Sequence, residues 1–230
     1  MNDVCVAWLD AGQTEGEFTL ALAALLLHDR RAQRVGNIVR VCGGVYVDRN
    51  RGDAVRDFLD SDFEWLFMLD ADMAWDADSL HRLLEVADPV ERPIVAGLYF
   101  SGGRMGGVMM PMIFELGADG HTRPVLDFPR DAIIEIHATG GGFCLWHRSV
   151  FEKMAESYGT LPDGSTNPLP FFADEIRDGR QYGEDIVACL RARALGFPIF
   201  MHTGVTAIHK KPAYLTVGFY DQLLAQRDEA

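Results

Sequence analysis

Four short apolar runs in the first hundred residues have the length of buried strands, and segments with helical spacing of apolar positions separate them. The expected strands cover residues 4–9, 37–42, 63–69 and 94–98. The expected helices cover residues 17–27, with Thr14 as a candidate cap, 51–59, and a stretch from Leu80 that stops before Pro89. This alternation predicts an α/β fold with three layers and a mostly parallel central sheet.

The second half of the chain has a different pattern. Residues 102–120 are rich in glycine and methionine and end in a turn signal, and residues 159–170 contain three prolines and two glycines. We expect both segments to be mobile loops. The regular elements expected here are a strand at 133–136, a helix at 149–157, a helix at 186–195 closed by Gly196, and a last strand within 199–209. No internal repeat or linker composition is visible, so we expect one domain over residues 1–230.

Composition narrows the function classes. The 230 residues are 48% hydrophobic, which is enough for a substantial core. The formal net charge is −13, and this argues against a nucleic-acid-binding surface, which needs clustered Lys and Arg. A nucleotide is still compatible with this charge, because a bound metal ion can supply the positive charge.

The cysteines and the apolar runs bear on location. Four cysteines form no CxxC pair, and three of them lie in apolar runs, which favours buried free thiols in a reducing compartment. The longest apolar stretch, residues 20–27, is too short to span a membrane. Because the start of the chain has no basic region before an apolar one, we expect no signal peptide and a cytoplasmic protein without a membrane span.

An apolar run of strand length, residues 63–69, leads directly into Asp70 and Asp72. Ligands of α/β proteins bind outside the carboxyl ends of the strands. Paired oxygen donors at such a place suit a hard divalent cation, Mg²⁺ or Mn²⁺, which commonly also holds substrate phosphates. The pair therefore points to a nucleotide-diphosphate substrate.

Two known acidic motifs, the EF-hand loop and the phosphatase motif DxDx[TV], also begin with the pattern Asp70-Ala71-Asp72. An EF-hand loop is excluded because Trp75 occupies the required glycine position and no glutamate follows at the twelfth position. A phosphatase of the haloacid-dehalogenase type is disfavoured because Ala74 replaces the required Thr or Val, and because the motif lies far from the start of the chain. We interpret Asp76 and Asp78 as caps of the following helix.

Two further carboxylates, Glu184 and Asp185, follow Gly183 at the start of an expected helix. Taken alone, they are ordinary capping groups that interact with free amides and the helix dipole. Together with a strand-end acidic pair, such a carboxylate can also accept a proton from an acceptor hydroxyl or orient it.

His209 ends the last expected strand, just before Lys210 and Lys211. A neutral imidazole is a possible metal ligand, although an isolated histidine is more often a surface or core residue. His202 has a similar position on the same strand. The position of His209 after the two acidic motifs and beside a basic pair favours it as a candidate metal ligand.

Two segments could bring backbone close to a ligand. Arg49 and Asn50 precede an expected helix, where free amides and polar side chains suit an anionic or ribose-bearing ligand; an ordinary solvated loop explains them equally well. The glycines of residues 139–143 allow close approach of backbone to a substrate. This run is neither a dinucleotide-binding fingerprint nor a P-loop.

In this order, the motifs resemble those of GT-A glycosyltransferases, close to family 2 and to related bacterial and phage enzymes. The resemblance extends through most of the chain and rests on Arg49-Asn50, Asp70-Ala71-Asp72, Gly140-Gly141-Gly142-Phe143, Glu184-Asp185 and His209.

The resemblance implies a metal-dependent transfer of a sugar from a nucleotide-diphosphate sugar to a hydroxyl acceptor, a protein or a small molecule. Residues 1–100 would bind the donor and residues 101–230 the acceptor, and the two loop segments would cover them. The implied ligands of Mn²⁺ or Mg²⁺ are Asp70, Asp72 and His209. The implied catalytic residues are Asp185, as base in an inverting enzyme, and Glu184. Further implied substrate contacts are Arg49, Asn50, Asp70, Gly141, Gly142 and Lys210.

The chain departs from family 2 at its start. The first strand ends in residues 8–12 without the usual Pro-x-Tyr-Asn opening, and the second strand lacks the acidic pair that reads the base, which leaves Asp10 and Gly12 as weak candidates. Two other functions stay open. One is a Mg²⁺-dependent phosphohydrolase or nucleotidyltransferase that uses the same carboxylates. The other is an inactive GT-A-like module that binds a partner through Met105, Met109, Met110 and Met112.

Overall fold

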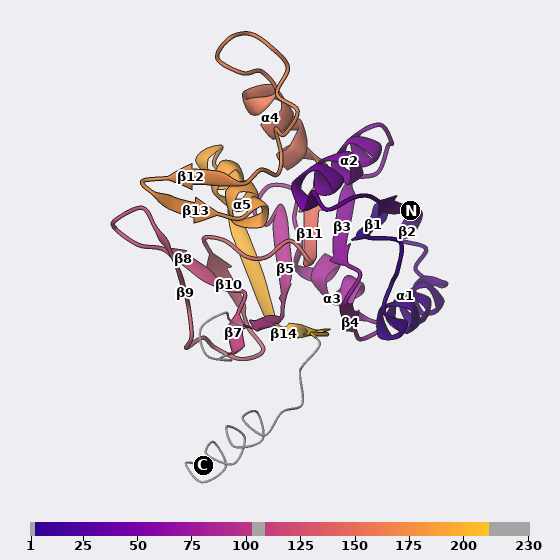
Figure 1. Cartoon of the computed structure of the whole chain (residues 1–230). Coiled ribbons are helices and arrows are strands. Elements are labelled where there is room, and N and C mark those ends of the chain that lie inside the picture. The colour runs from indigo at the N-terminus through magenta and orange to yellow at the C-terminus, as the bar shows by residue number, and fades with distance from the viewer. Residues whose placement is uncertain (1–2, 103–108, 212–230) are drawn as a thin grey trace, which may run out of the picture.

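The computed structural model describes residues 3–102 and 109–211, so Met105 lies outside the described residues. Its main feature is an eight-stranded sheet (Figure 1). Five strands run in one direction: β2 (Val35–Cys42), β1 (Val4–Asp10), β3 (Trp65–Asp70), β5 (Ile94–Leu98) and β14 (Ile199–His209). Three run in the other: β11 (Phe143–His147), β10 (Ile133–Ile136) and β4 (Met73–Trp75). The strand order is β10-β14-β5-β11-β3-β1-β2, with β4 paired to β14.

Helices cover both faces of this sheet (Figure 1). One face packs against α2 (Val47–Leu59), α4 (Arg148–Tyr158) and α5 (Glu184–Ala194). The other packs against α1 (Gly16–Asp29) and α3 (Ser79–Val86). A sheet covered on both faces needs strands that are apolar throughout, and β1 is accordingly buried at all seven positions. The expected α/β fold with three layers and a mostly parallel sheet is confirmed.

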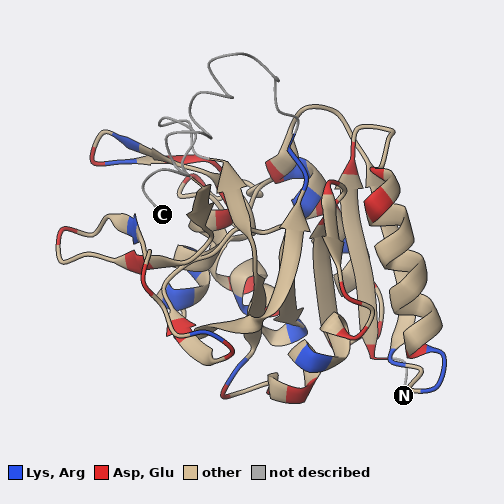
Figure 2. Cartoon of the chain, turned by 90° about the horizontal axis from the view of Figure 1, so that it is seen from below, with Lys and Arg blue, Asp and Glu red and all other residues tan. Residues whose placement is uncertain are grey.

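Successive side chains of each strand enter different cores, as the two-residue repeat of a strand requires. In β1, Val4, Val6 and Trp8 pack on the α1 side, whereas Cys5 and Ala7 pack on the α2 side. Charged residues lie mainly in helices, in loops and at strand ends, which leaves the strands themselves largely apolar (Figure 2). The polar residues at the strand ends are therefore the ones that the fold presents to a ligand.

The largest difference from the expected fold is β11. The sequence predicted a glycine loop leading to a helix, but a strand comes between them and inserts antiparallel between β3 and β5. This run of five apolar and aromatic residues, Phe143–His147, was too short to separate from its flanks by periodicity. Its consequence is that the glycine run lies beside the carboxyl end of β3, where Phe143 pairs with Leu69.

Three short hairpins extend from the sheet, on the left in Figure 1. They are formed by β6 (Phe100–Gly102) with β7 (Met109–Pro111), β8 (Phe114–Leu116) with β9 (Thr122–Pro124), and β12 (Glu175–Arg177) with β13 (Arg180–Tyr182). The last hairpin turns at Asp178 and Gly179, whose φ angles are 51° and 76°. These values fit the Asp-Gly type I′ turn, a sequence signal that its short flanking strands obscured.

Of the predicted helix caps, Asp78 occupies the cap position of α3, whereas Thr14 does not cap α1. The side chain of Thr14 contacts the Thr19 hydroxyl, and Glu15 occupies the cap position of α1 without a side-chain hydrogen bond. At α3 the cap residue is Asp78, again without a side-chain bond, and the backbone carbonyl of Asp76 accepts from Ser79. Neither helix therefore begins with a side-chain cap bond.

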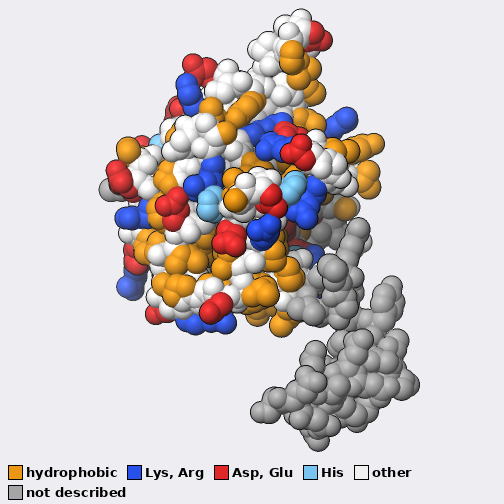
Figure 3. Space-filling model, turned by 90° about the vertical axis from the view of Figure 1, so that its left-hand side faces the viewer, with side chains coloured by type: hydrophobic (Ala, Val, Ile, Leu, Met, Phe, Trp, Pro, Cys, Tyr) orange, Lys and Arg blue, Asp and Glu red, His pale blue; other side chains and the backbone are white. Residues whose placement is uncertain are grey.

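Several expectations about the surface and the thiols can also be compared with the structure. Cys5, Cys144 and Cys189 are buried free thiols, as predicted, and Cys42 is exposed. Within residues 3–102 and 109–211, every helix is too short or too polar to cross a membrane. On the face shown in Figure 3, acidic and basic side chains are interspersed among apolar ones.

Candidate active site

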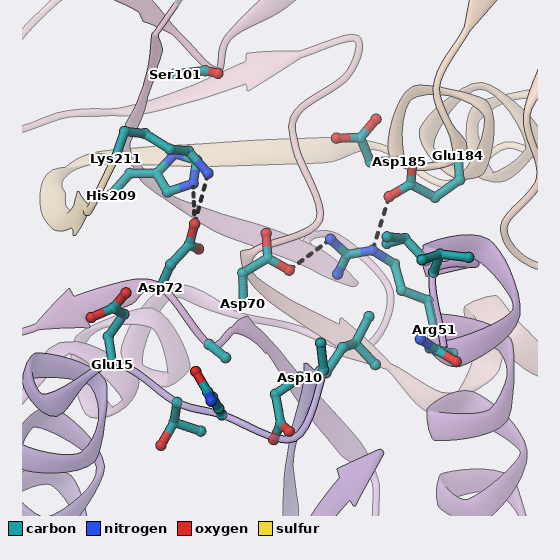
Figure 4. A pocket seen from close by; sticks show the side chains of 18 of the residues that line it. Asp10, Glu15, Arg51, Asp70, Asp72, Ser101, Glu184, Asp185, His209 and Lys211 are labelled. Atoms are coloured by element: carbon teal, nitrogen blue, oxygen red, sulfur yellow. Dashed lines mark hydrogen bonds and ion pairs between the residues drawn. The ribbon is translucent and has the colours of Figure 1, made fainter. Parts of the chain in front are cut away.

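The strands that run in one direction end at a shared cleft of about 670 Å³ (Figure 4). Its floor contains residues at or just beyond the ends of four of them: Asp10, Asp70, Tyr99 and His209. Its walls come from the beginnings of two helices, with Asn50 and Arg51 from α2 and Glu184 and Asp185 from α5. This is the place where α/β sheets bind ligands, because neighbouring strand ends leave a crevice there.

Asp72 lies at one end of the cleft, beside His209 and Lys211 (Figure 4). Its Oδ2 atom is 3.3 Å from Nε2 of His209 and accepts a hydrogen bond from Nζ of Lys211 at 2.7 Å. Burial opposes ionisation of this carboxyl, but the bonds from His209 and Lys211 outweigh it and lower its pKa to about 2. Asp72 is therefore an anion at any physiological pH.

The ring of His209 is oriented by the backbone. Its Nδ1 atom lies 3.0 Å from the carbonyl oxygen of Phe100, which can only accept, so Nδ1 carries a proton and donates. In the protonated ring, Nε2 also donates to the Asp72 carboxylate, whereas in the neutral ring its lone pair faces that carboxylate. Two electron pairs at this distance repel each other unless a proton or a cation lies between them. A histidine held in this way by a carbonyl is the usual arrangement at metal sites.

The residues present fit a divalent cation at Asp72 and His209. In the part of the chain that the structure describes, no three His, Cys, Asp or Glu side chains surround one point. Asp70, the third predicted ligand, faces Arg51 instead (Figure 4). Mg²⁺ and Mn²⁺ are commonly held by one or two carboxylates together with substrate phosphates and water, so two protein ligands are compatible with such a site.

Arg51 is the best-connected side chain of the cleft, and the sequence did not single it out. Its side chain is 4% exposed. Nε donates to Glu184 Oε1 at 3.1 Å, Nη1 to the carbonyl of Gly141 at 3.0 Å, and Nη2 to Asp70 Oδ1 at 2.8 Å. The guanidinium also lies 5.9 Å from the ring centre of Phe172. A buried guanidinium with three acceptors fixes the elements that carry them.

The three glycines of the 140–142 run each make room for one side chain of the cleft. A Cβ atom at Gly140 would lie 1.9 Å from the Tyr99 hydroxyl, one at Gly141 2.9 Å from the Arg51 guanidinium carbon, and one at Gly142 2.3 Å from Asp70 Oδ2. The glycines were predicted to bring backbone close to a substrate. Their close contacts in the structure are with the side chains of the site itself, and neither Gly141 nor Gly142 lines the cleft.

Asp185 faces the cleft at the beginning of α5 (Figure 4). Burial raises the pKa of its carboxyl to about 6, and the neighbouring Glu184 adds to this, whereas Arg51 opposes it. A carboxyl with this pKa is ionised at neutral pH but holds a proton far better than an ordinary aspartate. It is therefore suited to accept a proton from a substrate hydroxyl.

Asp10, a weak candidate for contact with a base, has all its lone pairs directed into the protein. Its side chain is fully buried and accepts from Arg40 Nε and Nη2, from the Trp8 indole and from the amide of Gly12. These bonds lower the pKa of Asp10, the Arg40 bond most of all. Asp10 therefore holds the end of β1 and has little capacity left for a ligand.

The cleft thus contains most, but not all, of the predicted site residues. Those that line it are Asn50, Asp70, Asp72, Glu184, Asp185 and His209. Arg49 and Lys210 do not: the guanidinium of Arg49 stacks 4.7 Å above Tyr46, and Nζ of Lys210 pairs with Glu15 and Glu17. Lining residues that the sequence did not single out include Arg51, Tyr99 and Lys211. The basic pair pointed to this place, and Lys211, not Lys210, lines the cleft.

The two expected loop segments also fall partly outside the cleft. Met112 and Ser101 line it, so residues near the 102–120 segment do reach the site. None of residues 159–170 lines it. That segment closes on itself through bonds between Leu161 and Ser165 and between Asn167 and Gly159, and it lies next to α4 at the top of Figure 1.

No protein-family model matches the chain, and no curated protein matches it. Among solved structures, it is similar to A197 from STIV, with a TM-score of 0.53 and 16% identity over 91% of this chain and 86% of that one. It is also similar to GalNAc-T7 with UDP, GalNAc and Mn²⁺, with a TM-score of 0.57 and 11% identity over 90% of this chain. The chain spans only 43% of the GalNAc-T7 chain. Identities this low establish the fold alone, which resembles that of a GT-A glycosyltransferase.

Proposed function

We propose that the protein is a metal-dependent glycosyltransferase that moves a sugar from a nucleotide-diphosphate sugar to a hydroxyl acceptor, a protein or a small molecule. One observation carries the proposal: a single cleft contains the adjacent side chains of Asp72 and His209, whose donor atoms suit a cation, and a carboxyl of raised pKa, Asp185. Sugar transfer needs both, because one side of the reaction develops negative charge on the leaving diphosphate and the other releases a proton. The GT-A-like fold and the Mn²⁺ in the GalNAc-T7 structure support it.

On the donor side, Asp72 and His209 would hold Mn²⁺ or Mg²⁺, with the donor diphosphate completing its coordination. Such an ion acts as a Lewis acid that neutralises charge on the leaving group. Lys211, whose ammonium group already lies at the Asp72 carboxylate, is placed to contact the phosphates as a further cation. Residues 1–100 supply Asp72 to this side and residues 101–230 supply His209 and Lys211, while Asn50 lies on the wall of the same cleft.

On the acceptor side, residues 101–230 supply Asp185. In an inverting transfer, its carboxylate accepts the proton of the attacking hydroxyl, so that the oxygen becomes a stronger nucleophile as the bond to the sugar forms. In a retaining transfer, the same carboxylate orients the acceptor. Glu184 lies beside it and faces Arg51. The net charge of −13 favours a partner other than nucleic acid, and the buried thiols fit a reducing, cytoplasmic compartment.

The test is thermal unfolding with a panel of nucleoside diphosphates, each measured with and without Mn²⁺. We expect one nucleoside diphosphate together with Mn²⁺ to raise the Tm more than the two separate increments combined, because ligands that bind only the folded state stabilise it. Asp72→Asn should remove this excess. Asp76→Asn is the matched control, since Asp76 is exposed and does not line the cleft. An excess that persists in Asp72→Asn would contradict the assignment.

A further inference from the structure

Arg51 lies between the two acidic pairs of the cleft and contacts one member of each. Asp70 belongs to the pair at the end of β3, and Glu184 to the pair at the beginning of α5, 133 residues further along the chain. The other two members, Asp72 and Asp185, make no hydrogen bond to Arg51: Asp72 is bonded to Lys211, and Asp185 Oδ1 accepts from the amide of Ile186. Figure 4 shows Arg51 between Asp70 and Glu184, with Asp72 on the far side of Asp70.

The arrangement leaves Asp70 little freedom. Its Oδ1 atom accepts from Arg51, its Oδ2 atom lies where a Cβ of residue 142 would be, and its amide donates to the carbonyl of Gly142 at 2.9 Å. Turning this carboxylate towards Asp72 would leave a guanidinium that is 4% exposed without one of its two anionic partners. An unpaired buried charge is strongly unfavourable, so Asp70 stays with Arg51.

The same guanidinium fixes Glu184 and acts on its neighbour. Glu184 Oε1 accepts from Arg51, so this carboxylate is directed along the wall of the cleft (Figure 4). Two neighbouring carboxylates, Glu184 and Asp70, raise the pKa of Asp185, and Arg51 lowers it. The charge of Asp185 in turn contributes to the raised pKa of the Tyr99 phenol. The position of Arg51 therefore affects how far these carboxylates raise the pKa of Asp185.

We propose that Arg51 is a positioning residue that divides each acidic pair into a held member and a working member. Asp70 and Glu184 are held, and they keep the end of β3, the 140–142 run and the beginning of α5 in one rigid unit. Asp72 and Asp185 are the working members, one at the cation and one at the acceptor. This inference rests on the proposed function for the two working roles, whereas the held roles follow from the contacts of Arg51 alone.

The held role of Glu184 is tested without any substrate. A ¹³C NMR titration of the Asp185 carboxyl is recorded for the wild type, Glu184→Gln, Arg51→Lys and the exposed control Glu152→Gln. We expect Glu184→Gln to shift the Asp185 midpoint to lower pH, because a neighbouring negative charge is removed. Arg51→Lys should shift it to higher pH, since a lysine cannot keep all three contacts and its charge moves away. Asp185 midpoints identical to that of the control in both variants would overturn the proposal.

The division of the first pair is tested by the Mn²⁺ concentration that gives half-maximal binding of the nucleoside diphosphate. Asp70→Asn should retain the Mn²⁺ requirement, with this midpoint changed by less than about threefold, whereas Asp72→Asn should lose the requirement. Loss of the requirement in both variants would overturn the division. If the wild type binds no nucleoside diphosphate with Mn²⁺, the proposed function fails, and the Asp185 titration still decides whether Arg51 has the role given to it.

Discussion

Nε2 of His209 lies 3.3 Å from Oδ2 of Asp72, while Nδ1 of the same ring donates to the carbonyl of Phe100 at 3.0 Å. The second contact fixes the tautomer, so the first is favourable only with a proton or a cation between the two atoms. Histidines that bind metals are commonly oriented by a carbonyl in the same way. Asp72 and His209 come from the ends of β3 and β14, two strands that are not neighbours in the sheet.

His209→Asn should weaken the cation site. We expect the Mn²⁺ concentration needed for nucleoside-diphosphate binding to rise by about 10- to 100-fold, the loss commonly seen when groups that support a metal are removed. The measurement is a Mn²⁺ titration at fixed nucleotide, followed by calorimetry. His28→Asn, on the last turn of α1, is the control. An unchanged Mn²⁺ midpoint in His209→Asn would exclude His209 as a ligand.

Lys211→Met should lower the affinity for a nucleoside diphosphate by roughly tenfold, because one hydrogen bond from a charged group is lost. The loss should shrink as salt is added, since the ammonium group is partly exposed and its charge is screened. Lys210→Met should have a smaller effect, because Lys210 does not line the cleft and its Nζ is engaged by Glu15 and Glu17. Equal losses in the two variants would show that the basic pair acts only through overall charge.

Asp185 should determine the pH dependence of turnover. With a pKa of about 6 in the free protein, the base is protonated below this pH, so kcat/KM should rise with pH through about 6 and then level off. Asp185→Asn should lower kcat by about 10²- to 10⁴-fold and remove this limb. A pH–rate profile of both proteins is the measurement. An acidic limb that survives in Asp185→Asn would assign the base to another residue.

The same shift predicts an effect on stability. A carboxyl with a pKa raised on folding binds its proton more tightly in the folded state. Its favourable contribution is present below the unfolded pKa and is lost as the pH rises from 3.8 to about 6. Asp185→Asn should therefore have a higher Tm than the wild type at pH 7 to 8, with a smaller difference at pH 4. A lower Tm of the variant at pH 7 would contradict burial as the cause of the shift.

Gly142→Ala should disturb Asp70. The added Cβ would lie 2.3 Å from Asp70 Oδ2, so the carboxylate or the backbone must move. Strain of this kind costs about 1–3 kcal/mol of unfolding free energy, measurable by urea denaturation. Gly16→Ala is the matched control, because nothing lies within 4 Å of its Cβ position. Equal stability of Gly142→Ala and Gly16→Ala would show that the 142 position tolerates a side chain.

The parts of the fold that could be predicted are those with long or strongly apolar signals. The runs that became β1 and β3 are apolar because helices cover both faces of the sheet, and for the same reason the polar residues after them mark its functional edge. This placed Asp70 and Asp72 correctly at a strand end. β11 was missed because a five-residue apolar run between glycines and a helix has no distinctive period.

The parts that could not be predicted depend on contacts between distant segments. Arg51 has the sequence pattern of a solvated helix residue, since charged residues are rarely buried unless paired. Its burial follows from Glu184, 133 residues away, and from Asp70, and neither pairing leaves a local trace in the sequence. The clearance that Gly140 gives Tyr99 is of the same kind. Such side chains are identified only when the strand order is known.

The most direct test of the account is the fate of nucleotide-diphosphate sugars incubated with the protein and Mn²⁺. Mass spectrometry of the products distinguishes a nucleoside diphosphate with a released or transferred sugar from a nucleoside monophosphate or free phosphate. We predict cleavage between the sugar and the diphosphate, with activity lost in Asp72→Asn. Cleavage within the diphosphate, or release of phosphate, would contradict a glycosyltransferase and favour a phosphohydrolase or nucleotidyltransferase that uses the same carboxylates.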